Sequence, residues 1–226
     1  MINIEAMFKI TYGLYVVCSG DKESGNGFIS NTVFQVSSKP AKFAAACHKN
    51  NFTSGVIVKN NCFSVSILHK ETDPELFGRF GYKSGKDYSK LDGMEIKYGE
   101  TGVPIVLNDA IAYLECKVVQ KLDVGSHWLF IGELADAQIV NEQKEPITYD
   151  YYRKINKGAA PQNAPTYIES SELVDEKEQV GPGNYKCAAC GYIFNENKEG
   201  VIFTGLPDKW TCPVCGADKK VFREIL

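Results

Sequence analysis

The sequence predicts a mainly β protein, in which a β-barrel with two short helices is followed by a small metal-binding domain. Residues 1–155 consist largely of short apolar or alternating runs separated by polar turns, which is typical of a barrel. Residues 156–182 lose this pattern and gain proline, glycine and acidic residues, as flexible linkers do. Residues 183–226 contain two cysteine pairs and are too few to fold around an apolar core alone. We therefore expect a barrel domain at 1–155, an acidic linker at 156–182 and a metal domain at 183–226.

The barrel domain divides into strands and helices in a regular order. The predicted strands are residues 13–18, 28–36, 42–48, 62–68 and 102–107, followed by a long hairpin of 111–122 and 127–140. One helix is expected to begin near Asn50 or Asn51, because asparagine caps helices well. A second is expected at Asp73-Pro74, with aspartate at the cap and proline in the first turn. No Gly-x-Gly-x-x-Gly follows a strand, so a Rossmann nicotinamide domain is not expected.

The metal domain is defined by two Cys-x-x-Cys pairs, Cys187/Cys190 and Cys212/Cys215. Each pair forms a turn that directs both sulfurs to one point, and two such turns build a tetrahedral four-sulfur site. This geometry selects zinc or a single iron ion. The glycine after each pair allows backbone N–H groups to approach the sulfurs, which tunes the metal.

The remaining composition excludes several classes of protein. The net charge is −3, which argues against nucleic acid as a partner. No apolar run is long enough to cross a bilayer and no signal peptide is recognised, so we expect a soluble, cytoplasmic protein without a membrane partner. The other cysteines are single residues in apolar runs, and we expect reduced, buried thiols. They are Cys18, Cys47, Cys62 and Cys116.

The metal domain resembles rubredoxin, an electron carrier with one iron ion. The resemblance rests on the stretches 185–194 (YKCAACGYIF) and 206–219 (LPDKWTCPVCGADK), and it extends over the whole domain. It implies iron rather than zinc at the four cysteines. The stretch between the two pairs, residues 195–203, is shorter than in typical single-domain rubredoxins.

The barrel domain resembles the flavin reductase family, the FMN-binding split barrels that include flavoredoxin. Residues 31–40, Asn50, Thr53 and residues 123–134 are similar to that family in order and spacing. The resemblance implies a homodimer with FMN near the subunit interface, and NAD(P)H binding without a Rossmann domain. With the metal domain included, the whole chain resembles the high-molecular-weight rubredoxins.

This resemblance also assigns roles to individual residues. The residues implied at the polar edge of the flavin ring are Asn31, Thr32 and Gln35. Those implied at its phosphate are Ser37, Asn50 and Thr53. His127 takes the position near the nicotinamide. From the residues alone, the polar strand side chains indicate either a ligand or a solvated face. An ordinary capped helix without a ligand is the better interpretation of the stretch from Asn50, and a surface histidine is the better interpretation of His127.

The expected function is electron transfer from NAD(P)H through FMN to the iron, and then to an acceptor protein. The resemblance suggests a flavodiiron protein that reduces oxygen or nitric oxide as the acceptor. One alternative is a barrel that acts as a binding module with a zinc-ribbon docking tail. Another is a flavin reductase that releases free reduced flavin. The linker would allow the metal domain to reach its own flavin, that of a partner subunit or an outside acceptor.

Overall fold

A computed structural model of the chain describes residues 2–156, 158, 160–168 and 182–225. The helices and strands of the barrel domain are η1 (Ile4–Lys9), β1 (Tyr15–Ser19), β2 (Asn26–Ser30), β3 (Val33–Ser38), β4 (Ala41–His48), α1 (Phe52–Asn60), β5 (Cys62–Leu68), α2 (Pro74–Gly81), β6 (Ile96–Tyr98), β7 (Pro104–Val106), β8 (Ala110–Asp123), β9 (His127–Ile139) and α3 (Tyr149–Lys154). Those of the metal domain are β10 (Asn184–Cys187), β11 (Ile193–Asn195), α4 (Glu196–Glu199), η4 (Phe203–Gly205), η5 (Lys219–Val221) and β12 (Phe222–Glu224).

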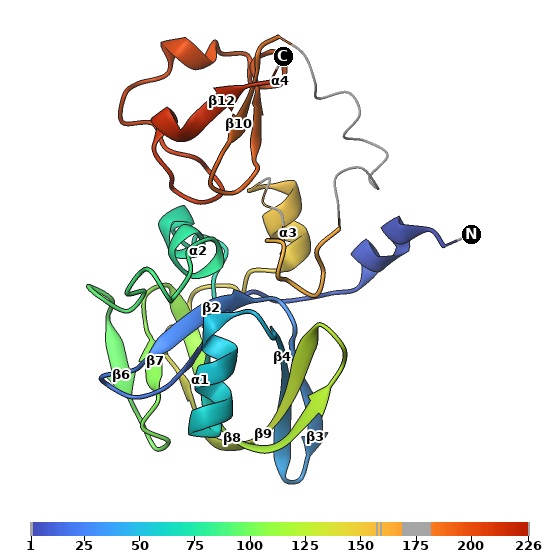
Figure 1. The fold of residues 1–226 in the computed structure, drawn as a ribbon, viewed down its shortest axis with the longest axis vertical. Helices are drawn as coiled ribbons and strands as arrows, with labels where there is room; N and C mark the ends of the chain where they lie inside the picture. Colours follow the sequence, from blue (N-terminus) through green and yellow to red (C-terminus); the bar gives the residue numbers. More distant parts are fainter. Residues whose placement is uncertain (1, 157, 159, 169–181, 226) are drawn as a thin grey trace.

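The barrel is a curled antiparallel sheet with the strand order β2-β1-β5-β8-β9-β4-β3 (Figure 1). The two strands at the ends of this order, β2 and β3, are consecutive in the chain. They are joined by Asn31 and Thr32, and the Thr32 carbonyl accepts a hydrogen bond from the N–H of Ala46 in β4, at 3.1 Å. The chain therefore crosses the open seam of the barrel at Asn31 and Thr32, and the predicted split barrel is confirmed.

Most predicted elements are confirmed, but one predicted strand is wrong, and η1, β6 and α3 were not predicted. Both helices begin as expected, because Asn51 accepts from the Thr53 N–H and Asp73 from the Glu75 N–H. The prediction of one strand over residues 28–36 was wrong. The chain bends after Ser30, whose hydroxyl accepts from the Thr32 N–H at 3.3 Å and competes with the sheet ladder. Helix α3 was not predicted; Thr148 caps it by accepting from the Tyr151 N–H.

Two apolar clusters form the core. One fills the barrel and includes Val17, Ile57, Phe63, Val65 and Phe130. The other extends from the barrel through α2 and α3 into the metal domain and includes Leu76, Phe77, Tyr152, Val214 and Phe222. The two domains therefore share one apolar cluster.

Three of the four single cysteines of the barrel are buried, as expected. Cys18, Cys47 and Cys116 are buried and Cys62 is half-buried. Burial raises the pKa of the thiols of Cys18, Cys47 and Cys116 to about 12, so these three are unreactive at neutral pH.

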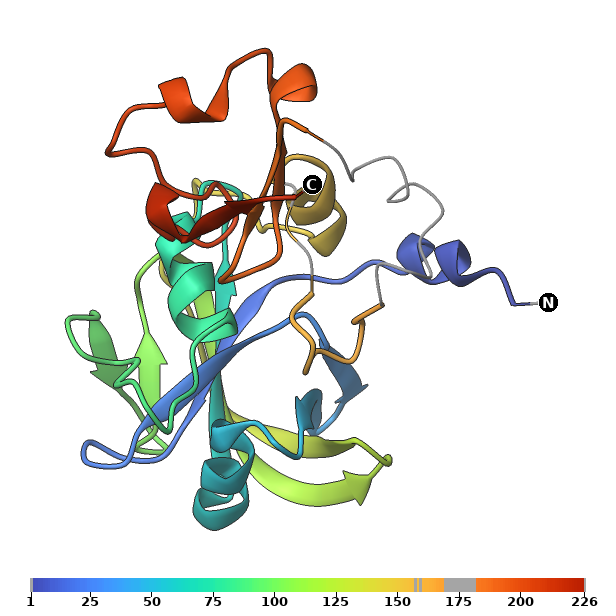
Figure 2. The ribbon, with the colours of Figure 1, turned by 45° about the horizontal axis from the view of Figure 1, so that its top comes forward.

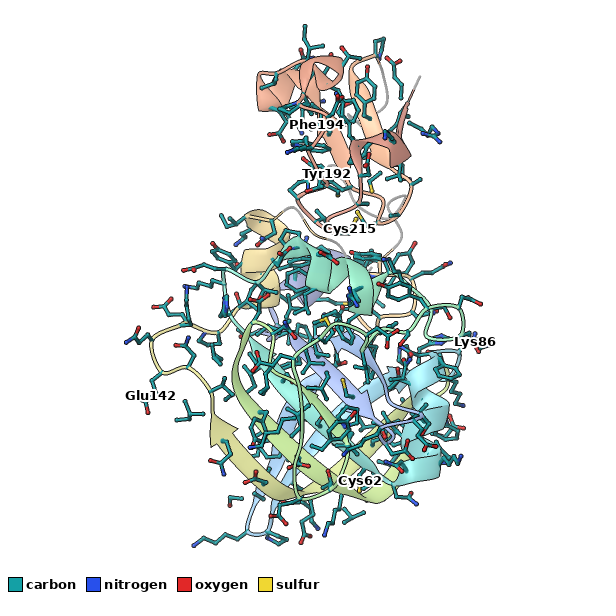
Figure 3. All side chains as sticks on the ribbon, turned by 90° about the vertical axis from the view of Figure 1, so that its left-hand side faces the viewer. Cys62, Lys86, Glu142, Tyr192, Phe194 and Cys215 are labelled. Atoms are coloured by element: carbon teal, nitrogen blue, oxygen red, sulfur yellow. The ribbon has the colours of Figure 1, made fainter. Side chains whose placement is uncertain are left out.

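The metal domain is a small sheet, β11-β10-β12, covered by aromatic rings. Phe203 lies at the centre of these rings, stacked on Tyr185 at 4.2 Å and in edge contact with Phe194 and Trp210. The domain sits on α2 and α3 at one end of the barrel, as two views of the ribbon show (Figures 1 and 2). Cys215 lies on its barrel-facing side and Phe194 farther away (Figure 3).

The predicted linker begins with residues that contact the barrel. Residues 160–168 pass beside the seam, where the Asn31 amide donates to the Thr166 hydroxyl at 2.6 Å. Residues 169–181 of the predicted linker lie outside the described residues. Among the helices that the structure describes, none has the length and apolarity to cross a bilayer.

Candidate metal centre and flavin site

The four cysteines of the metal domain lie close enough to share one ion. Their sulfurs all fall within 4.8 Å of one another. The Cys187 and Cys215 sulfurs are 3.8 Å apart, and those of Cys190 and Cys212 are 3.6 Å apart. A tetrahedron of metal–sulfur bonds of about 2.3 Å has edges of about 3.8 Å. The donor set therefore fits a single tetrahedral ion.

The two cysteine turns have the same backbone pattern. The N–H of Gly191 donates to the Cys187 carbonyl at 2.9 Å, and that of Gly216 to the Cys212 carbonyl at 2.8 Å. Both glycines have positive φ, 83° and 67°, which side-chain-bearing residues rarely adopt. Backbone N–H groups also donate to the sulfurs, for instance from Ala217 to Cys215. Such hydrogen bonds stabilise thiolates and tune the potential of the ion they hold.

A cavity of about 400 Å³ opens beside the seam of the barrel. This volume lies within the range of small-molecule sites. Its lining comes from the end of β2, the start of α1, the loop after α2 and the segment 161–165. Ala189, from the first cysteine turn of the metal domain, also lines it. The cavity therefore lies where the two domains meet.

Three of the residues expected to bind flavin lie at or near this cavity. Asn31 and Asn50 line it. Thr32 lies at the seam, and its buried hydroxyl oxygen has no hydrogen-bond partner among the described residues. A buried hydroxyl without a partner is costly unless a bound molecule supplies one. This position therefore fits a polar ligand such as a flavin.

The structure does not bring the other three to the cavity lining. Thr53 is fully buried, and its hydroxyl donates to the Asn26 side chain at 2.9 Å. Gln35 and Ser37 lie on the β3–β4 hairpin, where they bond the carbonyls of Ser37 and Pro40, respectively. Their assignment to flavin stays a prediction.

His127 is buried and hydrogen-bonded at both ring nitrogens. Its Nδ1 lies 2.8 Å from the Ser126 hydroxyl and its Nε2 3.2 Å from the Asn163 carbonyl. Because a carbonyl can only accept, Nε2 carries a proton. Burial, with a smaller effect of His48, lowers the pKa of the ring, so the neutral form is favoured at pH 7. His127 thus anchors segment 161–165 over the cavity, and its role towards nicotinamide stays a prediction.

Lys90 is a charged group of the cavity that the sequence did not reveal. It is 3% exposed, and its ammonium donates to the carbonyls of Gly27 and Phe80 at 3.0 and 3.1 Å. Burial lowers its pKa to about 8. Neighbouring Lys83 also lines the cavity. No local pattern distinguishes Lys90 from the exposed lysines of the same loop, so only the fold could identify it.

A split barrel with a polar cavity, joined to a four-sulfur metal site, defines a two-domain redox protein. The flavin reductase like domain family matches residues 7–158, and the rubredoxin family matches residues 184–222. The chain belongs to the high-molecular-weight rubredoxins: it is 35% identical to the High molecular weight rubredoxin of Moorella thermoacetica, over 99% of this chain and 100% of that protein.

Two further similarities concern the barrel. The chain is 43% identical to the Ferric-chelate reductase (NAD(P)H) of Archaeoglobus fulgidus, over 75% of this chain and 99% of that protein. The structure of the NADH:FAD oxidoreductase SgcE6 of Streptomyces globisporus superposes with a TM-score of 0.57 at 22% identity, over 65% of this chain and 86% of that chain. The predicted fold class, the rubredoxin metal site and the flavin-reductase barrel are therefore confirmed.

Proposed function

We propose that the protein transfers electrons from NAD(P)H through FMN to a rubredoxin-type iron ion, and from there to an acceptor protein. One observation carries the proposal: Ala189, the neighbour of the metal ligand Cys190, lines the same cavity as Asn31 and Asn50. A cavity suited to a flavin and a cage suited to an ion therefore adjoin within one chain. The relative named for NAD(P)H-dependent ferric-chelate reduction supports the choice of donor.

When bound, a flavin takes up two electrons as hydride and can release them singly, whereas an iron–thiolate site takes up one. The residues of the chain hold and shield these groups. Asn31, Thr32 and Asn50 offer polar groups to the ring and its phosphate end. Lys90 places positive charge beside the same cavity, which favours an anionic phosphate. No side chain needs to act as an acid or base, because the cofactors supply the chemistry.

The segment 160–168 covers the cavity and limits access by water. It is attached at two points, by the bond between Asn31 and Thr166 and by that between His127 and Asn163. Gln162, Asn163 and Pro165 of this segment line the cavity. We infer that the cover orients the bound flavin and that the nicotinamide approaches beside His127.

The proposal includes a homodimer. Large apolar side chains are exposed on β3, on β8 and on the turn that follows β8. They are Phe34 (53%), Val36 (44%), Val119 (52%), Leu122 (39%) and Val124 (55%). Exposed apolar groups of this number favour an interface. A dimer through β3 would also place a partner near Gln35 and Ser37.

The proposed acceptor is a redox protein, with a flavodiiron protein as the candidate that the family resemblance suggests. The proposed compartment is the cytoplasm, which is reducing. The lack of disulfides among the described cysteines is consistent with this.

Rapid-mixing absorbance under anaerobic conditions tests the proposal. Protein loaded with FMN and iron is mixed with NADH, with and without added free flavin. We expect the iron–thiolate band to bleach at a rate that does not depend on free flavin. Bleaching only when free flavin is added would favour the flavin-releasing alternative. A colourless, zinc-loaded metal domain from iron-replete cells would favour the docking alternative.

A further inference from the structure

The backbone of the metal domain approaches helix α2 closely. A Cβ atom placed on Gly78, in the middle of α2, would lie 2.0 Å from the carbonyl oxygen of Cys215. The obstructing atom belongs to the backbone of a metal ligand, so it cannot rotate away. Only glycine at position 78 allows the second cysteine turn to approach α2 this closely.

The rest of the contact is also closely packed. A Cβ added to Gly216 would lie 3.0 Å from the backbone of Glu75, in the first turn of α2. Val214, which lies between two metal ligands, is 1% exposed. Its carbonyl lies 3.5 Å from the hydroxyl of Tyr152 in α3, and Tyr152 packs on Phe77 in α2. The second cysteine turn is therefore seated on both helices.

We propose that α2 and α3 form a docking site for the second cysteine turn (residues 212–216) of the same chain, and that Gly78 is the position that admits it. The occupant is the segment seated there in the structure. The docked arrangement is also the position in which the metal centre receives electrons from the barrel. This second assignment rests on the proposed function.

The cavities between the domains support this assignment. A second cavity, of about 590 Å³, lies between the domains and is lined by Cys190, Tyr82 and Tyr149. Ala189 and Tyr82 line both this cavity and the proposed flavin cavity. Docking of the second turn therefore holds the first turn, with Cys190, against the flavin side of the barrel. Gly78 acts as a positioning residue, since it contacts neither the cavity nor the ion.

The test uses full-length protein loaded with FMN and iron. Gly78→Ala places a methyl group against Cys215, whereas Gly55→Ala in α1 is the matched control, because nothing lies within 4 Å of a Cβ there. Both changes favour a helix, so helix propensity cannot explain a difference between them. Val214→Asp disrupts the same contact from the metal domain by placing a charge at a buried position. Its control is Val201→Asp, because Val201 is 48% exposed.

The readouts are amide hydrogen exchange in α2 and α3 and the radius of gyration from small-angle X-ray scattering. We expect Gly78→Ala and Val214→Asp to increase both the exchange rate and the radius of gyration. The two control variants should match the parent protein in both measurements. The loss of one buried valine alone lowers a docking equilibrium constant by about tenfold or more. Parent-like exchange and size in both docking variants would overturn the docking site. Because the two changes lie in different domains, misfolding of one variant leaves the other as a test.

Electron transfer is measured separately in the same variants. We expect NADH to reduce the flavin at the parent rate but the iron about tenfold more slowly, in proportion to the lost docking. If docking is lost and iron reduction keeps the parent rate, the receiving role of the docked position is wrong. If the parent itself shows no iron reduction by NADH, the proposed function fails while the docking result stands.

Discussion

The buried ammonium of Lys90 predicts an unusual dependence of barrel stability on pH. Its pKa falls from 10.5 to about 8 on folding because burial disfavours the charge. As the pH falls below 10.5, the unfolded chain therefore binds this proton before the folded protein does. Stability is then lost steadily down to pH 8, by up to about 1.4 kcal/mol per pH unit. Over this window the loss amounts to about 3 kcal/mol.

Lys90→Met should remove this dependence, because methionine keeps the apolar stem without a titrating group. Lys86→Met is the control, since Lys86 is an exposed lysine of the same loop (Figure 3). The assay is urea unfolding followed by far-UV circular dichroism at several pH values from 7.5 to 10.5. We expect the parent and Lys86→Met to gain stability with rising pH relative to Lys90→Met. Parallel curves for all three proteins would refute the assignment of a buried charge at Lys90.

Three other predictions concern the metal domain and the cavity cover. Phe203→Ala should destabilise the metal domain by about 3–5 kcal/mol, seen as a lower temperature for loss of the iron–thiolate band. Phe34→Ala, the same change at a side chain 53% exposed, should leave that temperature unaltered; equal shifts would contradict the proposed aromatic core. Cys190→Ser should abolish the parent iron spectrum yet preserve flavin reduction by NADH, and loss of both would show that the domains are not separable. The folded pKa of His127 is lowered, so its contribution to stability is complete above pH 6.5 and declines below it. His127→Gln should therefore show a smaller fall in Tm from pH 8 to 5.5, and an unchanged fall would argue against a neutral, buried ring.

The sequence was most informative where local chemistry dictates structure. The two cysteine pairs specified the metal cage, because a four-sulfur site follows from spacing and turn geometry alone. The caps of α1 and α2 were equally readable, since Asn51 and Asp73 bond backbone N–H groups two residues ahead of them. The strand break at Asn31 was missed because apolar residues continue on both sides of it. The break becomes visible only in the structure, where the Ser30 hydroxyl accepts from the Thr32 N–H and the chain crosses from one end of the sheet to the other.

Contacts between segments distant in sequence could not be predicted. Gly78 looks like an ordinary helix-weakening glycine until Cys215 is placed against it. Similarly, the attachment of Asn163 to His127 depends on the path that residues 160–168 take across the barrel. The proposed flavin site was therefore predicted in part: Asn31 and Asn50 line the cavity, whereas Lys90 needed the fold.

Anaerobic titration of the loaded protein with NADH, recording flavin and iron absorbance together, tests the central claim most directly. Because a flavin takes up two electrons and the iron one, both bands should be fully bleached at about 1.5 equivalents of NADH per chain. An iron band that persists after the flavin band has bleached completely, with NADH in excess, would contradict the transfer of electrons from the barrel to the metal centre.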